Sequence, residues 1–234
     1  MREKRLKVTL LSQTNRVETA ALAAKLCYSG ADIDSLKEAI SAGEQGKFIA
    51  KISSMGHTSV FEHLSFTFGA EGVSRTLTHQ LVRHRIASYS QKSQRYVLHK
   101  DFSYIIPPSV LEREEAAKEF RKAMDIIADS YSKLEELGVP KEDARYLLPN
   151  SCETKIIITM NARELLHFFR LRCCERSQWE IRELAIEMLK LAHAAAPSVF
   201  SGAGPACAAG ICSEGSMTCG RAKEVRSRFK KLLS

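Results

Sequence analysis

Hydrophobic residues recur along the chain with two different periods, and each period predicts one kind of element. The apolar run at 6–11 predicts a strand, and alternation at 64–72 predicts a second, half-buried strand. A β-branched run at 154–161 predicts a buried strand that leads directly into Asn161, a helix-capping residue. Strands and helices alternate along the chain, and the predicted fold class is α+β, with a central mixed or antiparallel sheet flanked by helices.

Apolar positions three and four residues apart predict the helices. These cover residues 17–29, 33–42, 46–55, 109–137, 162–174 and 177–196. Thr14 or Asn15 is expected to cap the first helix, and Gly56 is expected to end the third. The segment at 109–137, closed by Gly138, is the one long helix of the predicted fold, and we assign it a scaffold role.

A further helix is predicted from the spacing of Val73, Leu77 and Leu81. Gln80 and His84 fall seven and eleven residues after Val73, and therefore on the same apolar side. Polar groups on a buried face need partners. If the helix runs to about residue 84, its end carries an Arg-His-Arg triplet into an interior or interfacial position, away from bulk water.

The segment at 83–95 has the highest density of anion-binding side chains in the sequence and contains no acidic residue. Its guanidinium groups offer paired donors that match phosphate or carboxylate oxygens, and its serines add short neutral donors. Tyrosines beside these cations offer a flat surface to a heterocycle or an unstacked base. A solvated basic surface is the alternative. The side chains concerned are Arg83, His84, Arg85, Ser88, Tyr89, Ser90, Ser93, Arg95 and Tyr96.

The helix predicted at 162–174 carries cations on two sides. One side holds Arg163, His167 and Arg170, at spacings of four and three. Arg172 instead falls on the apolar stripe. A buried guanidinium without a partner is costly, so we expect Arg172 to meet a carboxylate or an anionic ligand. Two cationic sides also indicate that this helix serves two ligands or two subunits.

Composition limits the class of protein but does not identify its binding partner. The chain has 234 residues, of which 44% are hydrophobic, and this length suits one sizeable core in a single domain. The formal net charge of +8 indicates anionic partners but does not separate nucleotides from nucleic acids or membrane surfaces. Because neither a secretory signal nor a run of membrane-spanning length occurs, a cytoplasmic location is expected.

Seven cysteines in a reducing compartment are expected to be free thiols or metal ligands. Cys207, Cys212 and Cys219 lie in a glycine-rich tail whose spacings are wider than the usual paired zinc ligands. Zinc in this tail is an alternative to free thiols, with a fourth ligand from Cys152, Cys173 or Cys174. No metal is assigned to the predicted active site. The basic end at 221–234 predicts a frayed helix.

The basic segment also carries a resemblance to a known family. Its Arg-His-Arg at 83–85, with serines and an arginine at fixed spacings up to residue 95, resembles the signature of the flavin-dependent thymidylate synthases. The resemblance covers most of the chain, through GHTSVFEH at 56–63, RYLLP at 145–149, NARELLHFFRLR at 161–172 and SQWEIR at 177–182. It implies a synthase domain over 1–204, a cysteine-containing tail with a basic helix over 205–234, and a homotetramer with sites where subunits meet.

The resemblance also implies which residues hold the ligands. FAD would contact Ser59, Arg83, His84, Arg85, Gln91, Asn161, Ala162, Arg163 and His167. The nucleotide dUMP would contact Gln80, Leu81, Val82, Arg83, Gln91, Lys92, Ser93, Gln94, Arg95, Arg145 and Arg172, partly from a neighbouring chain. For Arg145 the alternative is a surface pair with Glu142. Arg172 would be catalytic, because a guanidinium beside the uracil ring favours negative charge on N3 or the adjacent carbonyl.

The reaction implied by the resemblance is the reductive methylation of dUMP to dTMP. Methylenetetrahydrofolate supplies the one-carbon unit, and FAD reduced by NADPH supplies hydride. Since the cofactors carry the chemistry, no cysteine nucleophile is expected. No glycine-rich turn of a dinucleotide-binding Rossmann unit occurs, so side chains would have to hold the flavin.

Departures from the family pattern and two rival hypotheses stay open. Gln91 stands where the family often has glutamate, and His167 stands where some relatives have asparagine. One rival is an RNA-binding module in which the basic segment holds phosphates while Tyr89 and Tyr96 stack bases. The other is a structural zinc protein organised by its cysteine-containing tail.

Overall fold

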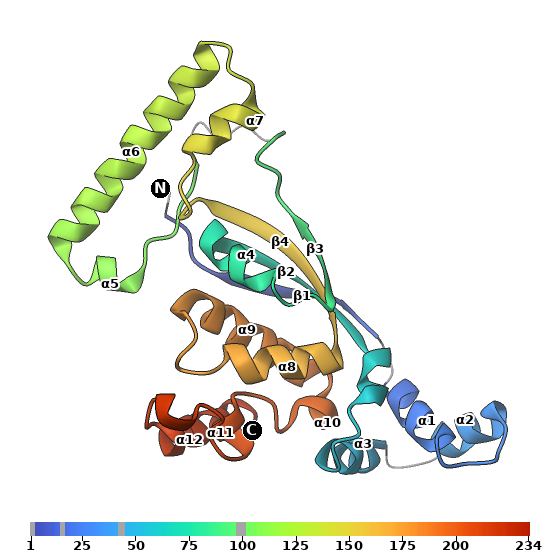
Figure 1. The fold of residues 1–234 in the computed structure, drawn as a ribbon. Coiled ribbons are helices and arrows are strands. Elements are labelled where there is room, and N and C mark those ends of the chain that lie inside the picture. The colour runs from blue at the N-terminus through green and yellow to red at the C-terminus, as the bar shows by residue number, and fades with distance from the viewer. Residues whose placement is uncertain (1–2, 15–16, 42–44, 97–101) are drawn as a thin grey trace. The chain divides into compact units, whose positions relative to one another are not determined.

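The computed structural model of the chain describes residues 3–14, 17–41, 45–96 and 102–234. Four strands form one antiparallel sheet in the order β1-β2-β4-β3 (Figure 1): β1 (Lys7–Gln13), β2 (Ser65–Ser74), β3 (Ala87–Gln91) and β4 (Glu153–Asn161). The hydroxyls of Thr67 and Thr159 bond across β2 and β4 at 2.9 Å. The Gly72 N–H, further along β2, bonds Glu153 at the start of β4. The predicted α+β class is confirmed, and the sheet is antiparallel.

Helices and short 3-10 turns make up most of the remaining described residues. The helices are α1 (Glu18–Leu26), α2 (Ile33–Ser41), α3 (Gln45–Ser54), α4 (Arg75–Leu81), α5 (Pro108–Leu111), α6 (Glu114–Glu136), α7 (Lys141–Ala144), α8 (Ala162–Arg172), α9 (Trp179–Ala195), α10 (Pro197–Phe200), α11 (Ala206–Ala209) and α12 (Ala222–Leu232). The 3-10 turns are η1 (Ser59–His63), η2 (Arg145–Leu147) and η3 (Gly215–Met217). Within the described ranges, none of these helices is long and apolar enough to cross a membrane.

The chain divides into two compact units. The first comprises Met1–Lys7, Ala70–Arg83 and Tyr89–Ile157. The second comprises Val8–Gly69, His84–Ser88 and Ile158–Ser234. The division falls inside all four strands, so each strand contributes residues to both units.

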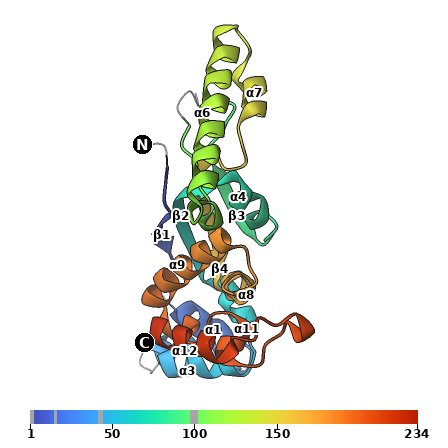
Figure 2. The ribbon, with the colours of Figure 1, turned by 90° about the vertical axis from the view of Figure 1, so that its left-hand side faces the viewer.

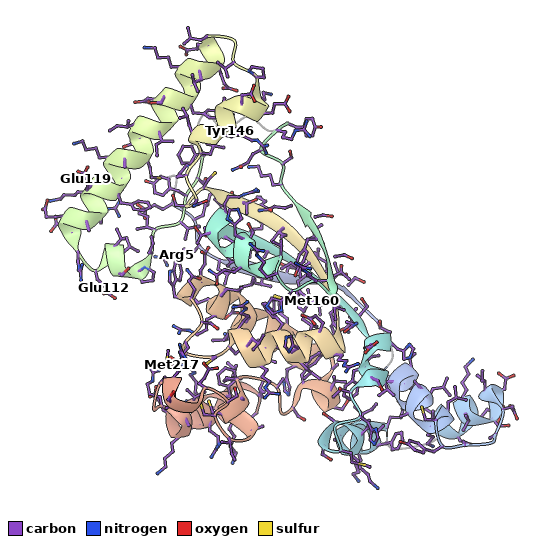
Figure 3. All side chains as sticks on the ribbon, in the orientation of Figure 1. Arg5, Glu112, Glu119, Tyr146, Met160 and Met217 are labelled. Atoms are coloured by element: carbon purple, nitrogen blue, oxygen red, sulfur yellow. The ribbon has the colours of Figure 1, made fainter. Side chains whose placement is uncertain are left out.

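Helix α6, 23 residues long, is the main helix of the first unit (Figures 1 and 2). Buried residues of this helix and of neighbouring segments form a hydrophobic cluster, made of Phe102, Tyr104, Ile106, Met124, Ala128 and Cys152. The side chains of Glu112 and Glu119 point outward from this part (Figure 3). The predicted continuous helix at 109–137 is wrong, because Arg113 has an extended backbone that separates α5 from α6. Gly138 follows the helix with φ +81°, as predicted.

The core of the second unit is aromatic. The rings of Phe66 and Phe200 meet edge to face, with centroids 5.4 Å apart, and Phe169 packs against Phe200 in the same way at 5.9 Å. Helix α8 packs against α9 and η1, and α10 packs against α9 and α3. Met160, at the end of β4, is 1% exposed (Figure 3). These contacts fix the position of α8 within its unit.

The predicted helix from Val73 to about residue 84 is wrong at both ends. The Ser74 hydroxyl accepts the Leu77 N–H at 3.0 Å, so this residue caps α4 and leaves Val73 in β2. The helix then ends at Leu81, three residues before His84. His84 is nevertheless only 6% exposed, so its predicted burial is confirmed. The prediction placed it on the buried face of the helix, whereas it lies beyond the helix end.

The predicted cap of the first helix is also wrong. Thr14 uses its hydroxyl to accept the Ser65 N–H at 2.9 Å, which joins it to β2. Helix α1 begins after Val17, whose side chain makes no capping bond. Asn15, the other predicted cap, lies outside the described residues.

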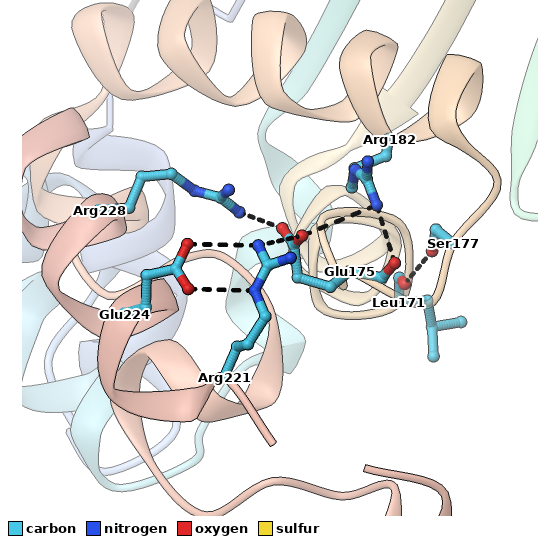
Figure 4. A network of polar contacts seen from close by, with 7 residues as sticks. All are labelled: Leu171, Glu175, Ser177, Arg182, Arg221, Glu224 and Arg228. Carbon is cyan, nitrogen blue, oxygen red and sulfur yellow. Dashed lines mark hydrogen bonds and ion pairs between the residues drawn. The ribbon is translucent and has the colours of Figure 1, made fainter. Parts of the chain in front are cut away.

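The C-terminal helix α12 is packed, not frayed. Its Val225 and Phe229 are buried. Glu175, in the loop after α8, forms ion pairs with three arginines, of which Arg221 and Arg228 belong to or border α12 (Figure 4). The third, Arg182, lies 3.9 Å away on α9. The tail is therefore held to the loop that follows α8.

Candidate functional site

Asn161 connects β4 to α8 and caps the helix. Its Oδ1 accepts the Glu164 N–H at 2.8 Å, so the predicted cap is confirmed. The next residue, Ala162, is fully buried and donates its N–H to the Leu64 carbonyl at 2.7 Å. The start of an eleven-residue helix has a positive dipole end and N–H groups without helical partners, both of which favour an anion.

A cavity of about 440 Å³ opens at this helix start. Its walls combine charged, polar and apolar side chains: Glu62, Ile86, Asn161, Arg163, Glu164 and His167. Arg163 forms an ion pair with Glu62 of η1, and both side chains are about half exposed. A positively charged arginine, an amide, an imidazole and an aliphatic wall suit a ligand with both a flat ring and an anionic group.

His84 forms a chain of contacts with two residues of α8. Its Nδ1 lies 3.1 Å from the Glu164 Oε1, and its Nε2 accepts the N–H of the Arg172 Nε at 3.0 Å. A guanidinium N–H can only donate, so Nε2 must be the unprotonated nitrogen. The proton of a neutral ring then lies on Nδ1 and is donated to Glu164. The contacts therefore assign both the charge and the tautomer of His84.

The electrostatic surroundings also favour a neutral His84. Burial is the largest cause that lowers the pKa of His84, and the nearby charges of Arg172 and His167 lower it further. The hydrogen bond and the charge of Glu164 act in the opposite direction, but the net shift is downward. Burial also lowers the pKa of Arg172 from its ordinary value, yet an arginine keeps its charge at neutral pH.

Arg172 was expected to meet a carboxylate or an anionic ligand. In the part of the chain that the structure describes, no carboxylate lies within ion-pair distance of its guanidinium. Its partner is instead the neutral ring of His84, and the carboxylate of Glu164 is one step further away. The positive charge of Arg172 is oriented but not neutralised by this contact.

Ser59 and Arg85 complete the predicted flavin residues of the second unit. Ser59 is exposed at the start of η1 and lines a different cavity, of about 340 Å³, beside His57 and Tyr28. Arg85 is exposed next to Ile86, which lines the 440 Å³ cavity. The structure thus gathers Asn161, Arg163 and His167 in one cavity, links His84 to Arg172, and leaves Ser59 in another.

The remaining predicted ligands belong to the first unit. Gln80 and Leu81 end α4, and Val82 and Arg83 follow them with exposed side chains. Gln91, in β3, donates its amide to the hydroxyls of Thr78 and Thr154 at 3.1 and 3.3 Å. The four residues after it lie on the connection that leaves β3: Lys92, Ser93, Gln94 and Arg95.

Glu142 joins two of the predicted nucleotide ligands. Arg95 bonds its carboxylate through Nε and Nη2, at 3.1 and 2.8 Å. Arg145 donates instead to the backbone carbonyl of Glu142, at 3.0 Å. The alternative proposed for Arg145, a pair with the Glu142 side chain, is therefore formed by Arg95. Arg95 and Arg145 therefore both bond Glu142, one through its side chain and the other through its backbone.

Sequence reasoning missed two carboxylates and an aliphatic residue of the site. Glu62 and Ile86 line the cavity, and Glu164 both lines it and bonds His84. Glu62 and Glu164 each lie inside a family-like motif that was recognised, but neither residue had been given a role. The available signal for Glu164 was its place three residues after a capping asparagine, where a glutamate faces the helix start.

The buried cysteines do not have the properties of nucleophiles. Cys152 is fully buried, and burial raises its pKa to about 11. Burial also raises the pKa of Cys173 and of Cys207. Cys212 is different, because a hydrogen bond from Thr218 lowers its pKa. Among the described residues, no three histidine, cysteine or acidic side chains are close enough together to hold a metal ion.

Comparisons with known proteins identify the family of the chain. The family described as thymidylate synthase complementing protein matches residues 9–198. A protein of Geobacter sulfurreducens named flavin-dependent thymidylate synthase is 56% identical over 230 residues, which cover 97% of this chain and 99% of that protein. Proteins of the same name from Clostridium tetani and Nitratidesulfovibrio vulgaris are 49% and 43% identical, over 96% and 92% of this chain and 97% and 94% of theirs. This chain therefore belongs to the thymidylate synthase complementing protein family.

Proposed function

We propose that this protein is a flavin-dependent thymidylate synthase. It converts dUMP, methylenetetrahydrofolate, NADPH and a proton into dTMP, tetrahydrofolate and NADP⁺. Full-length similarity to proteins of that name supports the activity. The observation that carries the chemical assignment is the guanidinium of Arg172, which is half-buried, bonded to a neutral histidine and still positively charged.

The cavity at the start of α8 fits part of a flavin nucleotide. Its polar groups can bind a pyrophosphate or the polar edge of an isoalloxazine ring, and Ile86 offers an apolar contact. The proposed FAD ligands are Ser59, Arg83, His84, Arg85, Gln91, Asn161, Ala162, Arg163 and His167. When bound, reduced FAD supplies the hydride that completes the new methyl group.

Binding of an anionic cofactor would change the contact between Arg163 and Glu62. Their carboxylate and guanidinium are about half exposed, so the pair adds little stability and can open at low cost. A phosphate would then take the place of the carboxylate on Arg163. Glu62 would remain free to accept a hydrogen bond from a sugar hydroxyl or a ring N–H of the same ligand.

For dUMP, the proposed ligands divide into phosphate and base contacts. Arg95, Ser93 and neighbouring side chains bind the phosphate and sugar through forked and hydroxyl donors. The complete set is Gln80, Leu81, Val82, Arg83, Gln91, Lys92, Ser93, Gln94, Arg95, Arg145 and Arg172. Arg95 must exchange its bond to Glu142 for one to phosphate, which an exposed ion pair permits.

Arg172 is the residue proposed to act on the reacting ring. Its positive charge beside the uracil lowers the pKa of N3, or stabilises negative charge on the adjacent carbonyl oxygen. Either effect raises the electron density at C5, the carbon that gains the one-carbon unit. Because His84 holds the guanidinium in place, this charge is oriented before the substrate binds, and no reorganisation is needed during the reaction.

The proposed enzyme is a homotetramer in the cytoplasm, with sites built where subunits meet. Residues 1–204 form the synthase domain in this proposal, and residues 205–234 form an added tail. Assembly lets the phosphate ligands of one copy serve a nucleotide beside the Arg172 of another. RNA binding is not favoured, because the Tyr89 hydroxyl donates to the Leu81 carbonyl at 2.9 Å and its ring is partly buried.

The test is to follow both the flavin and the product in the purified protein. We expect a yellow protein, or one that turns yellow with added FAD, whose absorbance band is bleached by NADPH under nitrogen. Adding dUMP and methylenetetrahydrofolate should then yield dTMP and restore the flavin band. Absence of dTMP from a flavin-loaded protein would overturn the proposal, as would a protein that fails to bind FAD.

A further inference from the structure

The contacts of His84 raise a question that the proposed reaction does not answer. A neutral imidazole can carry its proton on either nitrogen, and the two tautomers present opposite hydrogen-bonding groups to Arg172. With the proton on Nε2, that atom would face the N–H of the Arg172 Nε, donor against donor. The observed contact at 3.0 Å therefore requires the proton to stay on Nδ1, and a neighbouring group must favour that tautomer.

Glu164 is in the position to do this. Its side chain is 8% exposed, and its Oε1 lies 3.1 Å from the His84 Nδ1. An ionised carboxylate only accepts hydrogen bonds, so it is satisfied only by the tautomer that has its proton on Nδ1. The Asn161 cap fixes the backbone of Glu164, because it accepts the Glu164 N–H at 2.8 Å.

We infer that Glu164 is a positioning residue that holds His84 in the Nδ1–H tautomer, and thereby fixes the guanidinium of Arg172 toward the substrate. This inference rests on the proposed function for the identity of the substrate. Glu164 acts through His84 and does not touch the nucleotide. Its essential property is to accept a hydrogen bond; its negative charge is secondary.

Nearby side chains help to keep this arrangement unique. The ring of Phe168 meets the ring of His84 edge to face, with centroids 4.9 Å apart, which restricts rotation of the imidazole. A ring flip would put a ring carbon in the place of each nitrogen and bring a carbon–hydrogen group to Arg172. Because Phe168 is fully buried, the space for this flip is limited. Glu164 thus fixes the tautomer of His84, and Phe168 fixes the orientation of its ring.

The most direct test reads the tautomer in the wild-type protein. Histidine labelled with ¹⁵N should give a protonated, pyrrole-type signal for the His84 Nδ1 and an unprotonated, pyridine-type signal for its Nε2 near neutral pH. Comparison with a His84→Phe sample identifies these signals among the seven histidines. The opposite pattern would overturn the inference, and so would a doubly protonated ring. This measurement requires neither substrate nor activity.

Two variants at one position separate the role of an acceptor from that of a charge. Glu164→Gln keeps an oxygen that can accept the Nδ1–H, so kcat should stay within about threefold of the wild type. Glu164→Met has a similar length and no acceptor, so kcat should fall about tenfold while the KM for dUMP changes less than kcat. Equal losses in both variants would show that charge is what matters, and would overturn the inference.

A double-mutant cycle tests whether Glu164 acts through the histidine. In a His84→Phe background, Glu164→Met should cause no further loss of kcat, since the pathway from Glu164 to Arg172 is already cut. Additive losses would contradict the inference. The matched control is Glu153→Met, because Glu153 is also a buried glutamate but bonds the Gly72 N–H in the other unit. It should lower thermal stability and leave kcat unchanged.

The outcomes also separate this inference from the proposed function. If no variant and no wild-type preparation forms dTMP, the proposed function fails, while the ¹⁵N signals still report the tautomer. If wild type forms dTMP but the ring carries its proton on Nε2, the function stands and the role of Glu164 falls.

Discussion

Two arginines of helix α8 are held in different ways, although only nine residues separate them. Arg163, at the start of the helix, is about half exposed and pairs directly with the carboxylate of Glu62. Arg172, at the end, is partly buried and bonds the neutral ring of His84. A carboxylate neutralises the charge that it holds, whereas a neutral imidazole orients a guanidinium without cancelling it. The histidine between Glu164 and Arg172 therefore leaves the positive charge of Arg172 available to a ligand.

The carboxylates associated with these two arginines differ in their exposure and in whether they contact the arginine directly. Glu62 is in direct contact with its arginine and is exposed to solvent, so a competing anion can displace it. Glu164 is buried and reaches Arg172 only through His84. We therefore expect the start of α8 to exchange partners when a ligand binds, and its end to keep the same partners throughout.

Replacing Arg172 should have the largest effect. Arg172→Lys keeps a positive charge but loses the planar donor that His84 accepts, so kcat should fall by about 10²-fold or more, as for loss of an oriented donor in other active sites. Arg163→Lys, the matched change at the other end of the helix, should alter kcat by less than about threefold. Steady-state kinetics at saturating dUMP measures both. Equal losses would remove the distinction between the two arginines.

Acid should act on the Arg172 end of the helix through His84. The pKa of His84 lies below its ordinary value of 6.5, chiefly because of burial, so the ring is neutral at pH 7. Once it is protonated, Nε2 becomes a donor and must release Arg172. We expect kcat to fall as the pH drops below 6.5, with the loss abolished in His84→Phe, which should be slow at every pH. A wild-type kcat that is constant from pH 7 to pH 5 would contradict this.

The lowered pKa of His84 also predicts that the folded protein loses stability in acid. Between the ordinary pKa and the lower folded-state pKa, the unfolded chain binds a proton at His84 that the folded chain does not. The contribution of His84 to the free energy of unfolding is therefore complete above pH 6.5 and is lost as the pH falls. Thermal unfolding of wild type and His84→Phe across this range measures the difference.

The Arg163 end should respond to salt and to flavin. Glu62→Gln removes the charge that competes for Arg163, so FAD affinity should rise by a few fold at low ionic strength and much less at high salt. Flavin fluorescence titration of the apoprotein gives the Kd. The amide of the variant keeps an oxygen that can accept a hydrogen bond from the flavin, so a fall in FAD affinity would contradict the exchange of partners.

The smallest effect on chemistry is expected from the cysteines. Burial raises the pKa of Cys152 to about 11, so the thiolate is scarce at neutral pH. Replacing Cys152, Cys173 and Cys174 together by alanine should leave synthase activity measurable. Small cavities at the buried positions should lower the unfolding free energy by about 1 kcal/mol each. Complete loss of activity with the fold and the flavin retained would require a cysteine in the mechanism.

The elements that sequence predicted best are those whose own residues determine them. The β-branched run of β4 and the Asn161 cap of α8 are local signals, and both are confirmed. Strand β3 was missed because its sequence, ASYSQ, has little apolar character of its own. It is a strand because β4 lies beside it, and this pairing is not visible in a local pattern.

The site was predicted less completely because its central contacts are distant in sequence. His84 is 80 residues from Glu164 and 88 from Arg172. Spacing predicted that both His84 and Arg172 would need partners, but no period links one to the other. The prediction for Arg172 was a carboxylate or an anionic ligand; the described residues place no carboxylate in direct contact with it, and the anionic ligand stays a prediction. A neutral histidine satisfies the guanidinium, and a buried glutamate satisfies the histidine.

The central claim is that Arg172 presents positive charge to the uracil ring, and the ionisation of a bound nucleotide tests it most directly. In 5-fluoro-dUMP the fluorine makes the N3 proton easier to remove and provides a ¹⁹F signal that follows its titration. Bound to the flavin-loaded wild-type protein, N3 should have a lower pKa than in free solution, and this difference should largely disappear in Arg172→Met. An N3 pKa that is unchanged or raised on binding to the wild type would contradict the account.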